Sequence, residues 1–212
     1  MIHRVASGGT RNFHWEWLYK FGGVSAVLTG ALLLIGMISL IVSVLQPRIA
    51  NGWLLLFRDN WLVKIFILHA EFGDIHADLH GLSLLDVFIL VFVSVICFSI
   101  SVIFRNARKV WSLIAFALSL IAIILFLVTQ NAGRSTVMLV VLMNAFVMLG
   151  DKIFSKVSIY TGILAGAFLF VGDLTVGVHS NIITVIFGIG YVLLTIWFFL
   201  IAPTLLRLGR PS

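Results

Sequence analysis

Residues 82–104 read LSLLDVFILVFVSVICFSISVIF, an apolar run whose one charged residue, Asp86, lies near its start. A helix needs about 20 apolar residues to cross the ~30 Å hydrocarbon core of a membrane, so this run is long enough to span it. Further runs of this kind cover residues 21–45, 111–130, 135–149, 157–174 and 182–206. Their interiors contain no Lys, Arg or Glu, as expected where hydrocarbon surrounds a helix. The sequence therefore predicts an all-α, polytopic membrane bundle with six transmembrane helices.

The composition supports this class. The chain has 212 residues, of which 61% are hydrophobic and 10% charged, whereas soluble domains carry roughly 25% charged residues. The short connections leave no soluble domain, so we expect a single membrane domain over residues 1–212. Cys97 is the one cysteine, which excludes an intramolecular disulfide and a Cys-based metal site. The formal charge of +6 does not indicate nucleic acid, because the basic residues do not gather on one soluble face.

The basic residues divide unevenly between the two sets of helix ends, and this division predicts the orientation. One set holds Arg4, Arg11, Lys20, Arg105, Arg108, Lys109, Lys152, Lys156, Arg207 and Arg210, and the other holds Arg48, Arg58, Lys64 and Arg134. Cytoplasmic connections carry the excess of Lys and Arg. We therefore expect both termini on the cytoplasmic side of a bacterial cell membrane.

Residues 53–72 are apolar enough to suggest a seventh span, but they contain Arg58, Asp59 and Lys64. Each would cost roughly 2.5–3.5 kcal/mol near the centre of a span, and a seventh span would also turn the basic ends outward. We predict an interfacial segment in the first outer connection, with a re-entrant hairpin as the minor alternative. Aromatic residues anchor it; they are Trp53, Phe57, Trp61 and Phe66.

The N-terminal tail is also aromatic. Its cluster consists of Phe13, Trp15, Trp17, Leu18 and Tyr19, which we expect to anchor the chain at the cytoplasmic interface. The apolar run that follows is about 25 residues long, against 7–15 for the core of a signal peptide. We therefore do not expect a removable signal.

Glycines mark the expected helix contacts, since small residues let backbones approach closely in lipid. They are Gly23, Gly30 and Gly36 on the first run, Gly162 and Gly166 on the fifth, and Gly188 and Gly190 on the sixth. Such patterns usually serve packing within one chain. A contact with other membrane subunits through these glycine-rich faces is the alternative, and the lipid bilayer is the expected surrounding partner.

A His- and Asp-rich stretch precedes the second run and is a candidate metal site. Its ligands would be His69, His76, Asp78 and His80. Imidazole and carboxylate suit zinc or manganese, and His76 and His80 share a face in either a helix or a strand. The favoured interpretation is a solvated loop, because the spacing matches no strong metal motif.

Three ionisable residues lie near the outer ends of predicted spans and form a second candidate cluster: Asp86, Arg134 and Asp173. An Arg between two carboxylates can be buried at low cost. We favour a clamp that fixes helix packing over a ligand site. Asn144 is the one strongly polar side chain near mid-membrane, in the short fourth run, and we expect it to form an interhelical hydrogen bond. A transporter site is the alternative.

Several chemistries find no support. All six His residues lie in tails or connections, so none can pair within the membrane to hold a haem. No GxSxG, HExxH, P-loop or Rossmann pattern occurs. We therefore do not favour an enzyme.

Short strings in the chain resemble a family of uncharacterised six-helix bacterial integral membrane proteins. They lie at residues 81–86, 111–115, 131–135, 171–173 and 187–191. The resemblance covers most of the chain from the second run onward, and we expect the His- and Asp-rich stretch to be its least shared part. It implies the same six-span architecture and no established activity.

Two hypotheses follow for the function. The favoured one is a non-catalytic structural or accessory subunit of a membrane assembly. The other is a small-molecule transporter or binding protein, with Asp86, Arg134, Asp173 and Asn144 lining an outward-facing pocket. A metal-dependent enzyme on the outer face ranks third.

Overall fold

The computed structural model describes residues 14–45, 62–64, 84–105, 108–149, 152–175 and 181–210. Within them lie six long helices and no strand: α1 (His14–Leu45), α4 (Leu84–Phe104), α5 (Lys109–Val128), α6 (Gln130–Met148), α7 (Lys156–Leu174) and α8 (Asn181–Leu208). Five of these helices are long and apolar enough to cross a membrane, while α6 contains a shorter apolar segment, Gly133–Met148. The predicted all-α membrane class is confirmed at this level.

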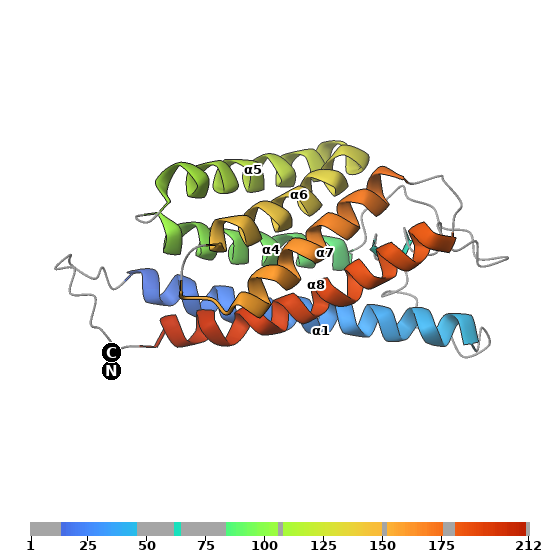
Figure 1. The fold of residues 1–212 in the computed structure, drawn as a ribbon, viewed down its shortest axis with the longest axis horizontal. Helices are drawn as coiled ribbons and strands as arrows, with labels where there is room; N and C mark the ends of the chain where they lie inside the picture. The colour runs from blue at the N-terminus through green and yellow to red at the C-terminus, as the bar shows by residue number, and fades with distance from the viewer. Residues whose placement is uncertain are drawn as a thin grey trace.

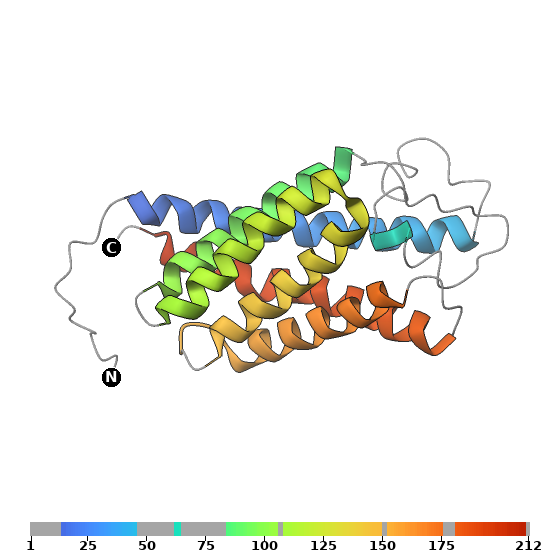
Figure 2. The ribbon, with the colours of Figure 1, turned by 90° about the horizontal axis from the view of Figure 1, so that it is seen from above.

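Successive helices run in opposite directions, and α1 packs against both α8 and α4 (Figures 1 and 2). The end of α8 meets the start of α1, since a methyl group placed on Gly209 would lie 2.9 Å from the Glu16 carbonyl oxygen. The first residues of α1 and the last residues of α8 therefore share one end of the bundle. We call this end the basic end, because it carries Lys20, Arg105, Arg108, Lys109, Lys156, Arg207 and Arg210.

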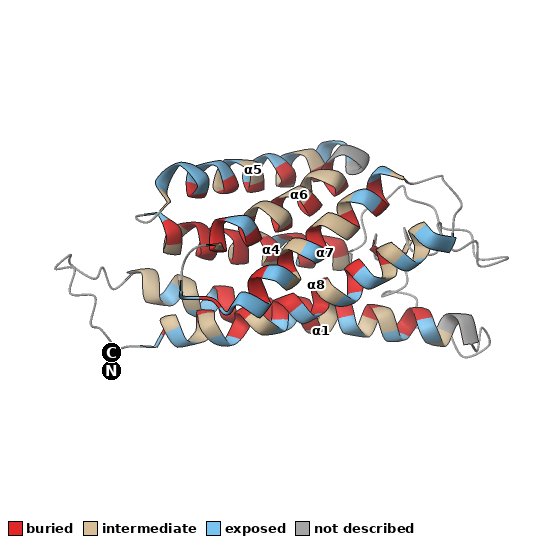
Figure 3. Ribbon diagram, viewed as in Figure 1, coloured by how far each residue is buried: buried red, intermediate tan, exposed pale blue. Residues whose placement is uncertain are grey.

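Burial follows the pattern expected in lipid. Buried residues line the inner faces of the helices, and exposed residues lie on the outer faces (Figure 3). Many of these exposed residues are large and apolar, among them Phe88, Ile124 and Phe199. A water-soluble bundle would place polar side chains there. The outer surface therefore suits a membrane environment.

Two helices begin five or more residues earlier than predicted. Helix α1 begins at His14 rather than at residue 21, so that Trp15 and Trp17 belong to its first turns. Continuing the helix satisfies backbone groups that would otherwise enter the membrane unpaired. Helix α6 begins at Gln130 rather than at residue 135, and only Thr129 separates it from α5.

Gly133 explains this tight connection. A methyl group placed on Gly133 would lie 2.1 Å from Cα of Phe126, so only glycine permits the close approach of α5 and α6. The Gly133 amide donates to the Thr129 carbonyl at 2.9 Å, which closes the first turn of α6. The polar residues here suggested a connection, but they form the start of a helix.

Five of the seven predicted glycine contacts are found, and they lie between helices of this chain. A methyl group on Gly166 would lie 2.9 Å from backbone atoms of Leu142 on α6, and one on Gly23 would lie 2.9 Å from the Leu206 amide nitrogen on α8. Gly30, Gly162 and Gly190 likewise face neighbouring helices. These faces are therefore used for packing within the bundle.

The interfacial segment predicted at residues 53–72 lies almost wholly outside the described residues. Its described part, residues 62–64, is helical, and both Leu62 and Val63 are buried.

Candidate functional site

Arg134 and Asp173 form a buried ion pair between α6 and α7. Nε of Arg134 lies 3.4 Å from Oδ1 of Asp173, and the two side chains are 6% and 2% exposed. Arg134 lies near the start of α6, where the positive end of the helix dipole disfavours its charge. Asp173 lies near the end of α7, where the negative end of the dipole disfavours a carboxylate. Their mutual attraction must offset both unfavourable positions, and the antiparallel packing of α6 and α7 brings them together.

Ser135 adds a second bond to the same carboxylate. Its hydroxyl donates to Oδ2 of Asp173. Asp173 thus contacts two consecutive residues of α6, and we call Arg134, Ser135 and Asp173 the α6–α7 clamp. The sequence did not single out Ser135 for this role. Its position next to Arg134 is the only sequence signal.

The guanidinium of Arg134 keeps unused donors. Within the described residues, its Nε and Nη1 make no hydrogen bond, so the contact with Asp173 is an ion pair without hydrogen-bond geometry at Nε. Asp86 is buried in the first turn of α4, at the same end of the bundle as the clamp. The structure thus pairs two members of the predicted cluster and places the third at the same end.

Asn144 departs from its prediction. It is fully buried in α6, but its Nδ2 donates to the Val140 carbonyl of its own helix at 2.9 Å. The prediction of an interhelical hydrogen bond is therefore wrong for Nδ2 of Asn144. The neighbouring face of α7 presents Gly162, Ala165 and Gly166, which offer no polar side chain, so the carbonyl one turn earlier is the acceptor within reach.

A second unpaired polar group lies on α8. In the described part of the chain, Oδ1 of Asn144 and Nε1 of Trp197 are both buried without a hydrogen-bond partner. A methyl group on Gly162 would lie 2.5 Å from Nε1 of Trp197 and 2.9 Å from Cβ of Ala145, the residue after Asn144. Two buried polar groups thus lack a partner inside the described bundle, an acceptor on α6 and a donor on α8. Sequence reasoning did not identify Trp197.

The predicted metal ligands His69, His76, Asp78 and His80 lie outside the described residues. Among the residues that are described, no group of three or more His, Cys, Asp or Glu side chains could hold a metal ion. A solvated loop stays the prediction for this stretch, with zinc or manganese binding as its alternative.

Two pockets lie away from the clamp, toward the basic end. One, of about 330 Å³, lies between α4 and α5, and the other, of about 410 Å³, lies beside the end of α8. Neither pocket is lined by Asp86, Arg134, Asn144 or Asp173.

Comparisons with protein-family models, curated proteins and solved structures find no match for this chain. The resemblance to six-helix bacterial membrane proteins stays a prediction.

Proposed function

We propose that this chain is a six-span protein of the bacterial cell membrane that acts as a non-catalytic structural or accessory subunit of a larger membrane assembly. The proposal rests on one observation: several buried polar side chains of the described helices bond to a neighbouring helix. The α6–α7 clamp joins two helices, and hydroxyls of Ser99, Ser112 and Tyr191 donate to carbonyls of neighbouring helices. These groups hold the bundle together, which is the work expected of a scaffold.

The helix order supports six spans. Helix α6 connects the end of α5 to the start of α7, and these lie at opposite ends of the bundle. Its 19 residues reach about 28 Å at 1.5 Å per residue, close to the thickness of the hydrocarbon core. The concentration of Lys and Arg at one end supports a cytoplasmic location for that end, and with it for both termini.

The outer face of α5 is the proposed partner surface. Helix α5 lies at the edge of the bundle, packs mainly against α4 and α6, and is the least buried of the five long apolar helices. Its buried residues are mostly small, whereas Trp111, Ile121 and Ile124 are exposed. A transmembrane helix of a partner could pack along this face.

Site-specific crosslinking in native membranes tests the proposal. A photoreactive residue replaces Ile121 on α5, and in the control it replaces Ile196 on α8, an isoleucine of similar exposure at a similar depth below the basic end. We expect position 121 to yield a discrete product with another protein, identified by mass spectrometry, and position 196 to yield lipid products. Absence of a protein product at both positions would contradict the subunit proposal.

A small-molecule transporter is the second candidate, and the unpaired Asn144 and Trp197 groups favour it. An unpaired polar group inside a membrane bundle costs free energy unless a ligand or water satisfies it. The test introduces Asn144→Cys in a Cys97→Ala background and measures reaction with a small water-soluble thiol reagent. Reaction at position 144, with none for Ala145→Cys in the same background, would favour transport over the subunit proposal.

A further inference from the structure

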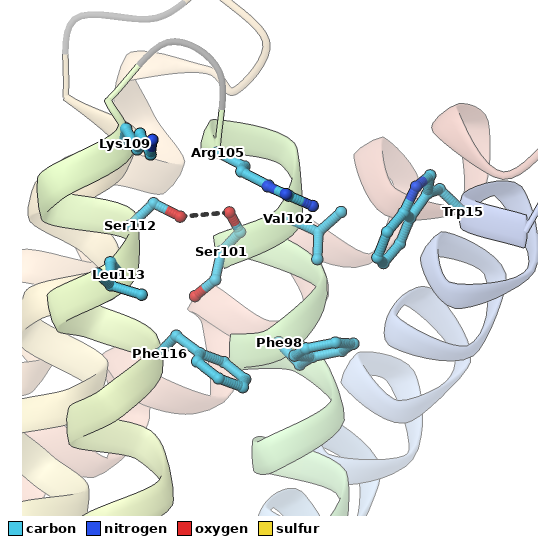
Figure 4. Close-up of a pocket in the computed structure, with 9 residues that line it drawn as sticks. All are labelled: Trp15, Phe98, Ser101, Val102, Arg105, Lys109, Ser112, Leu113 and Phe116. Atoms are coloured by element: carbon cyan, nitrogen blue, oxygen red, sulfur yellow. Dashed lines mark hydrogen bonds between the residues drawn. The ribbon is translucent and has the colours of Figure 1, made fainter. Parts of the chain in front are cut away.

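A groove opens between the end of α4 and the start of α5 at the basic end (Figure 4). Arg105 follows the last turn of α4, and Lys109 is the first residue of α5, so the two cations stand at the same level on antiparallel helices. Both are exposed. In the described part of the chain, neither lies within ion-pair distance of an acid. The rim of the groove therefore carries two positive charges that no described acid neutralises.

The inside of the groove is apolar and is closed by a pair of aromatic rings. Phe98 precedes Arg105 by seven residues and Phe116 follows Lys109 by seven, so both rings lie about 10 Å deeper than the cations. Their centroids are 5.2 Å apart. Leu113 lines the groove between the rim and the rings (Figure 4).

The wall also holds a buried hydroxyl with no partner. The last carbonyls of a helix lack helical donors, and that of Ser101 accepts the hydroxyl of Ser112. Ser101 is 4% exposed, and its hydroxyl has no hydrogen-bond partner among the described residues. Figure 4 shows its oxygen directed into the gap between α4 and α5, on the side of Leu113 and Phe116. A ligand oxygen in the groove would satisfy this donor.

We propose that this groove binds an anionic phospholipid of the surrounding membrane. The phosphate lies between Arg105 and Lys109, an ester oxygen accepts from the Ser101 hydroxyl, and the first part of an acyl chain lies on Leu113 and Phe116. The indole of Trp15, on the first turn of α1, lines the same groove at the level where tryptophans meet lipid headgroups. The volume of about 330 Å³ is in the range of small ligand sites. This site does not depend on the partner surface of α5.

Lipid binding to the purified full-length chain in detergent tests the proposal by native mass spectrometry. The probes are phosphatidylglycerol and phosphatidylcholine with identical acyl chains. The R105Q/K109Q variant removes the rim charge, and the matched control K20Q/K156Q removes two exposed charges from the same end outside the groove. We expect the wild-type chain to prefer phosphatidylglycerol. A basic side chain near an anionic surface contributes about 1 kcal/mol, so R105Q/K109Q should bind it roughly 30-fold more weakly. The control should bind like the wild type.

A further variant separates lipid binding from folding. Phe116→Trp narrows the groove without changing its charge, so it should also lower phosphatidylglycerol binding. Without lipid, this variant and the wild-type chain should melt at similar temperatures. Equal binding of the two lipids, or unchanged binding by R105Q/K109Q, would overturn the proposal. Displacement of the lipid by inorganic phosphate at equal concentration would also overturn it, because the ligand would then be a free anion.

Discussion

Arg134 shows how a single charged residue can be kept inside an apolar bundle. It has its nearest acid on α7, shares that acid with Ser135, and is almost fully buried. Taking both charges out of water is costly, and much of the pair's value lies in avoiding a lone buried charge. Removing one member of the α6–α7 clamp should therefore destabilise the fold by more than the intact ion pair stabilises it.

Replacing Arg134 by alanine should destabilise the chain by about 3–5 kcal/mol, because it leaves the carboxylate of Asp173 buried without its cation. The measurement is thermal unfolding in detergent. The double variant R134A/D173A should be less destabilised than the sum of the two single variants. Additive losses would show that the two side chains do not stabilise each other, and Lys156→Ala, at an exposed position, serves as the control.

At the scale of elements, the α5–α6 connection depends on one glycine. Gly133→Ala would place a methyl group against the backbone of Phe126, which cannot move aside as a side chain can. We expect this variant to lose most of its folded yield after membrane extraction. The matched control is Gly30→Ala, where the new methyl group meets the ring of Phe199 at 3.1 Å and the ring can shift. Similar yields for both variants would mean that α5 and α6 can separate without cost.

The α1–α8 pair offers a milder test. The hydroxyl of Tyr191 donates to the Leu33 carbonyl at 2.8 Å, joining two helices that lie far apart in the sequence. Interhelical hydrogen bonds in membranes contribute about 0.6 kcal/mol on average, so Tyr191→Phe should lower stability by roughly that amount. Tyr160→Phe, at an exposed position, should leave the unfolding temperature unchanged. A loss of several kcal/mol for Tyr191→Phe would contradict this expectation and would mean that the packing of α1 against α8 depends on this bond.

At the scale of the whole molecule, the helix order predicts which exposed residues lie on the same side of the membrane. Lys109 and Lys156 lie at the basic end, whereas Thr129 and Asn181 lie at the opposite end. Single cysteines at these positions, in a Cys97→Ala background, are labelled with a membrane-impermeant maleimide. We expect positions 129 and 181 to react in intact cells, and positions 109 and 156 to react only in inverted vesicles. Reaction of positions 109 and 129 from the same face would contradict the six-span arrangement.

The helix contacts could be predicted only in part. Gly23, Gly30, Gly162, Gly166 and Gly190 mark real contacts, because a missing side chain lets backbones approach whatever the partner is. The stripe of Ser112, Ala115, Ser119 and Ala122 on α5 performs the same task without glycine. The spacing of three and four residues was present in the sequence. It could not be recognised as a contact, because the sequence does not show which face of α5 packs against its neighbours.

The amino-acid sequence by itself determined that this chain forms long apolar helices suited to a membrane, with most of its charges at the helix ends. Each run does this independently, because hydrocarbon excludes unpaired charge and requires backbone groups to bond within the helix. Only the tertiary structure decided which polar groups meet. Arg134 reaches Asp173, Asn144 turns to its own helix, and Arg105 and Lys109 share one groove because helix order and rotation, set by close packing, determine which side chains become neighbours.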